Sequence, residues 1–276
     1  MRLSVTRTVL LLCATVLLGG CVGSMHALPE ITPDALAEYR EFLEEEQKNA
    51  VLKPIYRPIE DERAMVYRVT NRLLEHVHAM CLQTEYETCF MNVQYAPDAA
   101  EFNAYADHRD IITVNAGLVR YMESDDQLAA VVAHEMAHVM TQHVKKSMQN
   151  QQVGAIAMAL LLGGLSSAGG GQPRPSDIQN YGQVGANIGG IAFSKEMERE
   201  ADYLSAYLLA RSGYDLEEAK DIWVSFSVAR GEGSLKTAMF GTHPGSPERL
   251  AQWDATIKEI ADDDDMLPVL KAKTGQ

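Results

Sequence analysis

The 276-residue sequence has few cysteines, few basic residues and no long apolar run. Its four cysteines are too few for a small disulfide scaffold. Only 24 Lys and Arg oppose 38 Asp and Glu, and the formal net charge of −14 argues against a surface that binds nucleic acid through phosphates. The apolar runs at residues 9–18 and 153–165 are shorter than the roughly 20 residues of a membrane-spanning helix. With 46% hydrophobic and 22% charged residues, the composition predicts a globular protein with a packed core.

The first apolar run has the features of an export signal, because Arg2 and Arg7 precede its centre and small residues follow it. Leu18-Gly19-Gly20-Cys21 resembles the lipobox of bacterial lipoproteins, in which Cys21 would carry lipid and become the first mature residue. An ordinary cleaved signal with an incidental cysteine is the alternative. Val22 differs from the aspartate that usually retains lipoproteins at the inner membrane, so the resemblance implies the periplasmic face of the outer membrane.

Cys81 and Cys89 have seven residues between them, and we expect them to form a disulfide in that oxidising compartment. A pair of thiolate ligands for a metal is the alternative, although such pairs are more often two to four residues apart.

The mature sequence divides into a lipidated N-terminus with a polar tether and charged spacer helix (residues 21–58), a folded domain (59–260) and a solvated acidic tail (261–276). Within the domain, the pattern predicts an amphipathic helix around residues 66–80 and three short strands at residues 90–95, 101–106 and 110–114. A long helix begins after Ser124 and extends through Val144, and further helices follow Ser194, Asp215 and Ser246. Residues 149–190 are rich in glycine and apolar residues, and we expect a mobile insert or a lid.

The long helix contains His134-Glu135-Met136-Ala137-His138. Histidines four residues apart lie on one face of a helix, so one cation can bind both. Zinc accepts imidazole nitrogens, and a catalytic zinc site has three protein ligands and a position for water. Glu135 lies beside the first histidine and could act as general base on that water.

A second acidic motif follows about sixty residues later, in Glu198-Arg199-Glu200-Ala201-Asp202. Glu198 and Asp202 share one helical face, so Glu198 could bind the metal while Asp202 accepts a hydrogen bond from a ligand histidine. A solvated acidic face is the alternative, and it is the better interpretation for Glu196 and Glu200. His143 follows His138 by five residues rather than six, which disfavours a site with three histidine ligands.

Three segments resemble the HtpX and CAAX-prenyl-protease-like (Ste-type) family of gluzincin metallopeptidases, and most of all its bacterial periplasmic lipoprotein branch. They comprise residues 103–144, 193–204 and 242–249, in the order that the family has, and the resemblance covers roughly residues 66–253. It implies the zinc ligands His134, His138 and Glu198. It also implies that Glu135 is the base and that Asp202 orients a ligand.

The family's histidine–proline motif is matched at His243 and Pro244. The resemblance implies that His243 either stabilises the oxyanion during peptide attack or binds the metal as a fourth ligand that keeps the enzyme latent. A structural histidine in a turn is the alternative. Arg249, at the matching offset, either orients an acidic neighbour, polarises substrate or has a structural role.

We therefore expect an α+β, mostly helical zincin fold with a small antiparallel or mixed sheet, one Zn²⁺ per chain and metalloendopeptidase activity. The edge of the sheet, at residues 110–114, would pair with extended substrate. The resemblance implies unfolded or misassembled envelope proteins as substrates. Two alternatives stay open: an envelope assembly factor or chaperone with a latent zinc site, and a lipoprotein tether that binds no metal. The sequence leaves the oligomeric state open.

Overall fold

The computed structural model describes residues 24–49, 52–82, 89–150, 193–228, 243 and 245–271. The chain divides into two units, and one of them, Ser24–Val144 with Ala192–Gln276, contains every numbered helix and strand below. The other unit, Met1–Gly23 with Lys145–Ile191, lies mostly outside the described residues. The predicted signal, the lipobox with Cys21 and nearly all of the predicted insert therefore lie outside them as well.

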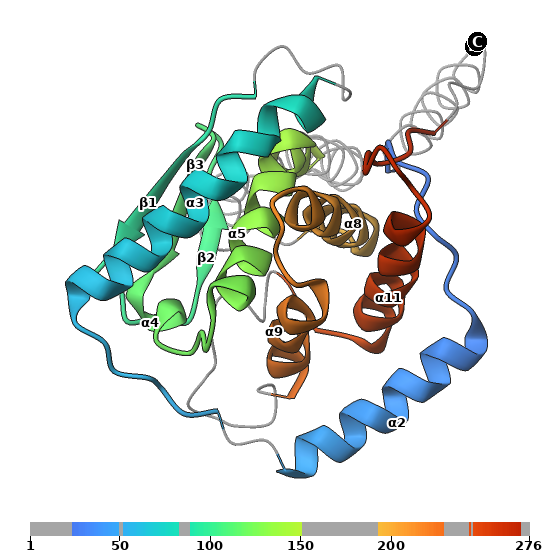
Figure 1. Cartoon of the computed structure of the whole chain (residues 1–276), viewed down its shortest axis with the longest axis horizontal. Helices are drawn as coiled ribbons and strands as arrows, with labels where there is room; N and C mark the ends of the chain where they lie inside the picture. Colours follow the sequence, from blue (N-terminus) through green and yellow to red (C-terminus); the bar gives the residue numbers. More distant parts are fainter. Residues whose placement is uncertain are drawn as a thin grey trace, which may run out of the picture. The chain divides into compact units, whose positions relative to one another are not determined.

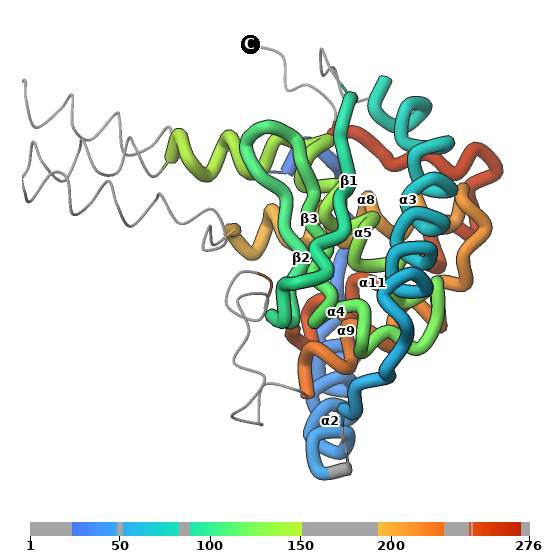
Figure 2. The backbone as a smooth tube through the Cα atoms, turned by 90° about the vertical axis from the view of Figure 1, so that its left-hand side faces the viewer, coloured from blue at the N-terminus to red at the C-terminus, as the bar shows by residue number. Residues whose placement is uncertain are grey.

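Three short strands form a mixed sheet with the order β1-β3-β2. They are β1 (Asn92–Ala96), β2 (Ala104–Ala106) and β3 (Ile111–Asn115), and β3 pairs parallel to β1 and antiparallel to β2. The expectation that residues 110–114 form the sheet edge is wrong, because β3 lies in the centre (Figure 2). All three runs are short and alternating, so the sequence pattern carries no information about their order.

The numbered helices are α2 (Pro33–Asn49), α3 (Ile59–Cys81), α4 (Ala116–Val119), α5 (Asp125–Met140), α8 (Lys195–Arg211), α9 (Leu216–Val228) and α11 (Pro247–Ala261). The predicted caps are present: the hydroxyls of Ser124, Ser194 and Ser246 each accept a hydrogen bond from the backbone N–H three residues later. Gly213 follows the end of α8 with φ 68°, a left-handed conformation that glycine adopts without steric cost. The structure confirms the mostly helical α+β fold.

Helix α5 forms the centre of the unit, and all of its residues from Gln127 to Met140 are buried. It packs against the sheet, α3, α8 and α9, so that α8 and the sheet lie on different sides of it (Figure 1). Its apolar residues fill these contacts, and they include Leu128, Val131, Val132 and Met136. The two histidines of α5 are therefore carried by a helix that is buried on all sides.

The long helix does not continue to Val144 as predicted. It ends at Met140, Gln142 adopts φ 55°, and residues 143–150 are helical again. On an unbroken helix, residues five apart point about 140° away from each other. The break after Met140 changes the direction of His143 relative to α5.

The chain around residues 24–26 is not the predicted solvated tether. Ser24 and His26 are buried, and the N–H of Ala27 donates to the carbonyl of Val269 at 2.8 Å. A bridge between His26 and Leu270 pairs this segment with the end of the described chain. The acidic residues 262–265 are mostly exposed as expected. After them, the backbone N–H of Val269 donates to the Tyr203 hydroxyl of α8 at 3.0 Å.

The remaining predicted features of the N-terminal half are present. None of residues 33–48 of α2 is buried, and the Tyr39 hydroxyl donates to Asp254 of α11. Cys81, the last residue of α3, and Cys89 form a disulfide. Among the described residues, none of the helices combines the length and apolar character needed to cross a bilayer.

Substitutions at Gln142 test the helix break. In a continuous helix, alanine is more stable than glycine by about 0.8–1.0 kcal/mol, whereas a left-handed residue with a Cβ atom costs about 1–2 kcal/mol. We therefore expect Gln142→Gly to have a higher free energy of unfolding than Gln142→Ala, by about 1 kcal/mol, in urea denaturation. A more stable alanine variant would show that the helix is continuous.

Candidate metal centre

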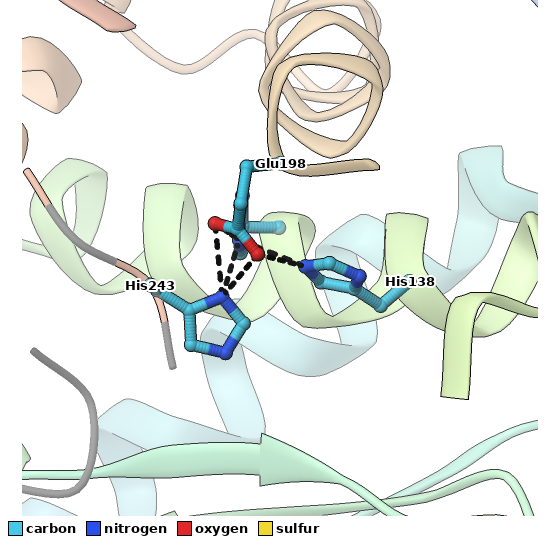
Figure 3. Close-up of side chains that lie close together, drawn as sticks. His138, Glu198 and His243 are labelled. Carbon is cyan, nitrogen blue, oxygen red and sulfur yellow. Dashed lines mark hydrogen bonds and ion pairs between the residues drawn. The ribbon is translucent and has the colours of Figure 1, made fainter. Parts of the chain in front are cut away.

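Four buried side chains converge beside the centre of α5. His134 and His138 come from α5, Glu198 from α8, and His243 from the chain before α11. One nitrogen or oxygen of each lies within 4.8 Å of the corresponding atoms of the other three. Figure 3 shows the Glu198 carboxylate between the rings of His138 and His243, each on a different part of the chain.

The distances between these atoms match a tetrahedral metal site. The Nε2 atoms of His134 and His138 are 3.1 Å apart, and they lie 3.4 Å and 3.3 Å from the two oxygens of Glu198. Ligand atoms bound tetrahedrally to zinc at about 2.0–2.1 Å are separated from one another by about 3.3–3.4 Å. Two imidazole nitrogens and a carboxylate therefore fit a divalent ion of zinc's size and ligand preference.

His243 lies at the fourth corner of the same cluster. Its Nδ1 atom is 3.0 Å from Oε1 of Glu198 and 3.1 Å from Nε2 of His134. Its other ring nitrogen lies 3.5 Å from Glu135 Oε1. The predicted neighbours Thr242 and Pro244 lie outside the described residues. This orientation directs a ring nitrogen into the cluster, as the position of a fourth ligand requires.

Glu135 is held in a fixed orientation beside the cluster. Its Oε2 atom accepts a hydrogen bond of 3.0 Å from the backbone N–H of Ala106, in strand β2. Within the described part of the chain, its buried Oε1 atom has no hydrogen-bond partner. Burial raises the pKa of this carboxyl, because the charged form is poorly solvated. One oxygen is thus anchored, and the other can accept a proton.

Asp202 and Arg249 form a buried pair behind His134. Asp202 Oδ1 lies 2.9 Å from Nδ1 of His134, on the side of the ring opposite the cluster. The guanidinium of Arg249 donates two hydrogen bonds of 2.7 Å and 2.6 Å to Asp202 and lies over the ring of Trp223. It also donates to the backbone carbonyl of His243. These contacts agree with one of the three roles considered for Arg249, namely that it orients an acidic neighbour.

The electrostatic environment favours the ionised forms of Glu198 and Asp202. Burial alone would raise the pKa of Glu198, but electrostatic interaction with the neighbouring His243 and hydrogen bonds from the surrounding histidines hold it well below its usual value. Burial likewise opposes ionisation of Asp202, whose pKa the Arg249 guanidinium lowers. Burial lowers the pKa of His138 well below its usual value, which favours the neutral imidazole that a metal requires.

Two residues next to the cluster, Glu200 and His143, were not predicted from the sequence as part of the site. Glu200 is 1% exposed, although a solvated position was expected, and its Oε2 atom lies 3.1 Å from Nε2 of His143. The Nδ1 atom of His143 is in turn 3.0 Å from Nδ1 of His138. The sequence did contain a signal for the burial of Glu200, because apolar residues lie on every side of the predicted helix after Ser194. An acidic residue on such an enclosed helix needs a buried partner. Glu196 is exposed, as predicted.

Substitution of Arg249 tests the buried pair. Arg249→Met would leave the ionised Asp202 buried without a counter-charge, and we expect the free energy of unfolding to fall by about 3–5 kcal/mol. Chemical denaturation of the metal-free protein measures this loss. Arg249→Lys keeps the charge but cannot form two parallel hydrogen bonds, so its loss should be smaller. Stability equal to that of the wild type in Arg249→Met would contradict the assigned contacts.

Comparison with known proteins identifies the family of the chain. The sequence profile described as "Peptidase family M48" matches residues 63–257. That range begins in α3 and ends in α11, and it includes all four residues of the cluster.

Individual relatives align with about half of the chain. The "Beta-barrel assembly-enhancing protease" of Escherichia coli (strain K12) is 30% identical over 158 residues, which cover 55% of this chain and 31% of that protein. The "Metalloprotease LoiP" of the same organism is 36% identical over 152 residues, covering 55% of this chain and 57% of LoiP. The "Mitochondrial metalloendopeptidase OMA1" of Schizosaccharomyces pombe is 28% identical over 148 residues, which cover 54% of this chain and 41% of that protein. The chain thus spans between about a third and three fifths of the length of these relatives.

Proposed function

The chain belongs to peptidase family M48, and we propose that it is a zinc metalloendopeptidase of the bacterial envelope. The observation that carries this proposal is the convergence of four buried ligand atoms beside the carboxylate of Glu135. A structural metal site would need the ligands but not the neighbouring base. We further propose that lipid on Cys21 attaches the mature protein to the periplasmic face of the outer membrane.

The protein's own residues divide the chemistry between them. His134, His138 and Glu198 would hold one zinc ion, which would polarise the substrate carbonyl and lower the pKa of a nearby water. Glu135 removes the proton from the attacking water through its Oε1 atom and passes it to the leaving nitrogen. The hydrogen bond from Ala106 holds the other carboxylate oxygen during both transfers. Asp202, fixed by Arg249, keeps the ring of His134 in the orientation that directs Nε2 towards the metal.

We propose that His243 is a fourth ligand that keeps the site latent. Its Nδ1 atom lies as close to Glu198 and His134 as the other ligand atoms lie to each other. A residue that supports an oxyanion would instead direct a donor towards the substrate and leave the fourth corner of the site to water. Cleavage then requires His243 to move away from the cluster.

Strand β2 would pair with the substrate backbone. Asn103 and Asp107, which flank β2, form hydrogen bonds with residues of the β3 strand at 3.1 Å and 2.9 Å, so the intervening Ala104 and Ala106 direct their backbone groups away from β3. An extended peptide added at this edge would lie beside Glu135. Ala104 is fully buried, however, and Ala106 is 6% exposed. A covered substrate edge agrees with a latent site.

We propose unfolded or misassembled envelope proteins as the substrates. Pairing with a strand edge requires an extended backbone, which folded proteins do not present. One relative, the "Beta-barrel assembly-enhancing protease" of Escherichia coli, is named for the assembly of β-barrels. A second function, assistance of assembly without cleavage, is favoured by the position of His243 in the cluster.

Replacement of Glu135 tests the enzymatic proposal. Because a general base contributes about 10²–10⁴-fold to rate, we expect Glu135→Gln to lower the cleavage rate of unfolded casein by about that factor. Zinc content, measured by mass spectrometry of the purified proteins, should stay at one ion per chain in both forms. Equal cleavage by wild type and variant would exclude the proposed role of Glu135 and with it the peptidase mechanism.

Replacement of His243 distinguishes latency from oxyanion support. We expect His243→Ala to raise the cleavage rate of the same casein, because the fourth position is then open to water. The double variant with Glu135→Gln should lose that activity, which shows that the cleavage comes from this site. A lower rate in His243→Ala would contradict latency and favour a role in stabilising the oxyanion.

A further inference from the structure

We propose that Glu200 and His143 are positioning residues that connect the N-terminal segment, residues 24–26, to the metal ligand His138. This inference rests on the proposed function, because it concerns residues that are not metal ligands but orient one of them. The contacts form one continuous series from the backbone of the N-terminal segment, through Glu200 of α8 and His143, to the ring of His138.

The first part of the series is the binding of the N-terminal segment by Glu200. Its Oε1 atom accepts hydrogen bonds from the backbone N–H groups of Met25 and His26, at 2.7 Å and 3.1 Å. The same oxygen lies 2.6 Å from Nδ1 of His26. Ser24 is held nearby, because its N–H donates to Glu196 at 2.8 Å. Two acidic residues of α8 thus fix the backbone of this segment.

The second part runs from Glu200 to the metal site, and the proton positions follow from its chemistry. If Nε2 of His138 binds the metal, its Nδ1 atom carries the proton and donates to Nδ1 of His143, 3.0 Å away. His143 then carries its own proton on Nε2 and donates it to Glu200, 3.1 Å away. A carboxylate only accepts hydrogen bonds, so every contact in the series has one donor and one acceptor.

Burial makes this series specific. His26 and His138 are fully buried, and His143 and Glu200 are each 1% exposed. In such surroundings a polar atom that loses its partner is not compensated by water, so each group restricts the orientation of the next. The left-handed Gln142 supplies the change in chain direction that precedes His143. The strained turn thus has a role in the site.

Coupling between the two ends of the series is reciprocal. If an ordered N-terminal segment favours the metal-binding orientation of His138, metal binding must favour the ordered segment by the same free energy. Zinc affinity and the protection of the N-terminal backbone should therefore change together when the connection is broken.

The test measures zinc affinity of the mature chain by competition with a chromophoric chelator. Loss of an outer partner of a metal ligand costs about 10–100-fold in affinity, and we expect this range for Glu200→Gln and His143→Phe. An amide carries both a donor and an acceptor, so His143→Gln should retain more affinity than His143→Phe. The exposed residues of α3 provide matched controls, Glu75→Gln and His78→Ala, which should bind zinc as the wild type does.

Hydrogen exchange tests the other end of the series. In the wild type, zinc should slow exchange of the Met25 and His26 amides, and in His143→Phe this effect of zinc should be lost. Thermal unfolding of each metal-free variant identifies any that do not fold. If His143→Phe does not fold, the zinc affinity and amide exchange of His143→Gln decide the outcome.

Two results would overturn the proposal. Folded Glu200→Gln and His143→Phe variants with the zinc affinity of the controls would show that neither residue positions His138. Amide exchange at residues 25 and 26 that is unaffected by zinc in the wild type would remove the connection to the N-terminal segment. Failure of the proposed function is a different result, in which the protein binds zinc but neither the wild type nor His243→Ala cleaves casein.

Discussion

The site depends on the packing of α8 against α5, which brings the Glu198 carboxylate to two imidazoles one helical turn apart. Four polar atoms of buried side chains then lie within 4.8 Å of each other. Repulsion between lone pairs and the loss of hydration make such a cluster costly unless protons or a cation are shared among its members. A divalent ion would satisfy all four groups at once, and its binding would account for these buried groups at the centre of the fold.

Helix α8 supplies the Glu198 ligand and two further acidic residues, of which Asp202 contacts a histidine of α5 directly and Glu200 acts through His143. Glu198 faces the metal position between them. Asp202 lies behind His134 and is itself held by Arg249. Glu200 reaches His138 through His143. Each imidazole therefore has a fixed partner on the side away from the metal, and both partners depend on the same helix.

The local parts of this account could be predicted from sequence, and the tertiary parts could not. Residue spacing was enough to pair His134 with His138 and Glu198 with Asp202, and the serine caps gave the helix starts. The order of the strands depends on long-range pairing that three similar short runs do not specify. The role of Glu200 depends on enclosure of α8 from several sides, and that of His143 on a left-handed turn at Gln142, which has no strong residue signal.

The most direct test of the central claim is X-ray absorption spectroscopy at the zinc edge on the purified protein. The account predicts one zinc per chain, with imidazole nitrogens and one carboxylate oxygen at about 2.0–2.2 Å and no sulfur ligand. In His138→Ala, the spectrum should show one imidazole ligand fewer in the coordination sphere of zinc. A protein without zinc, or a sphere that is unchanged by removal of His138, would contradict the assignment of the metal centre.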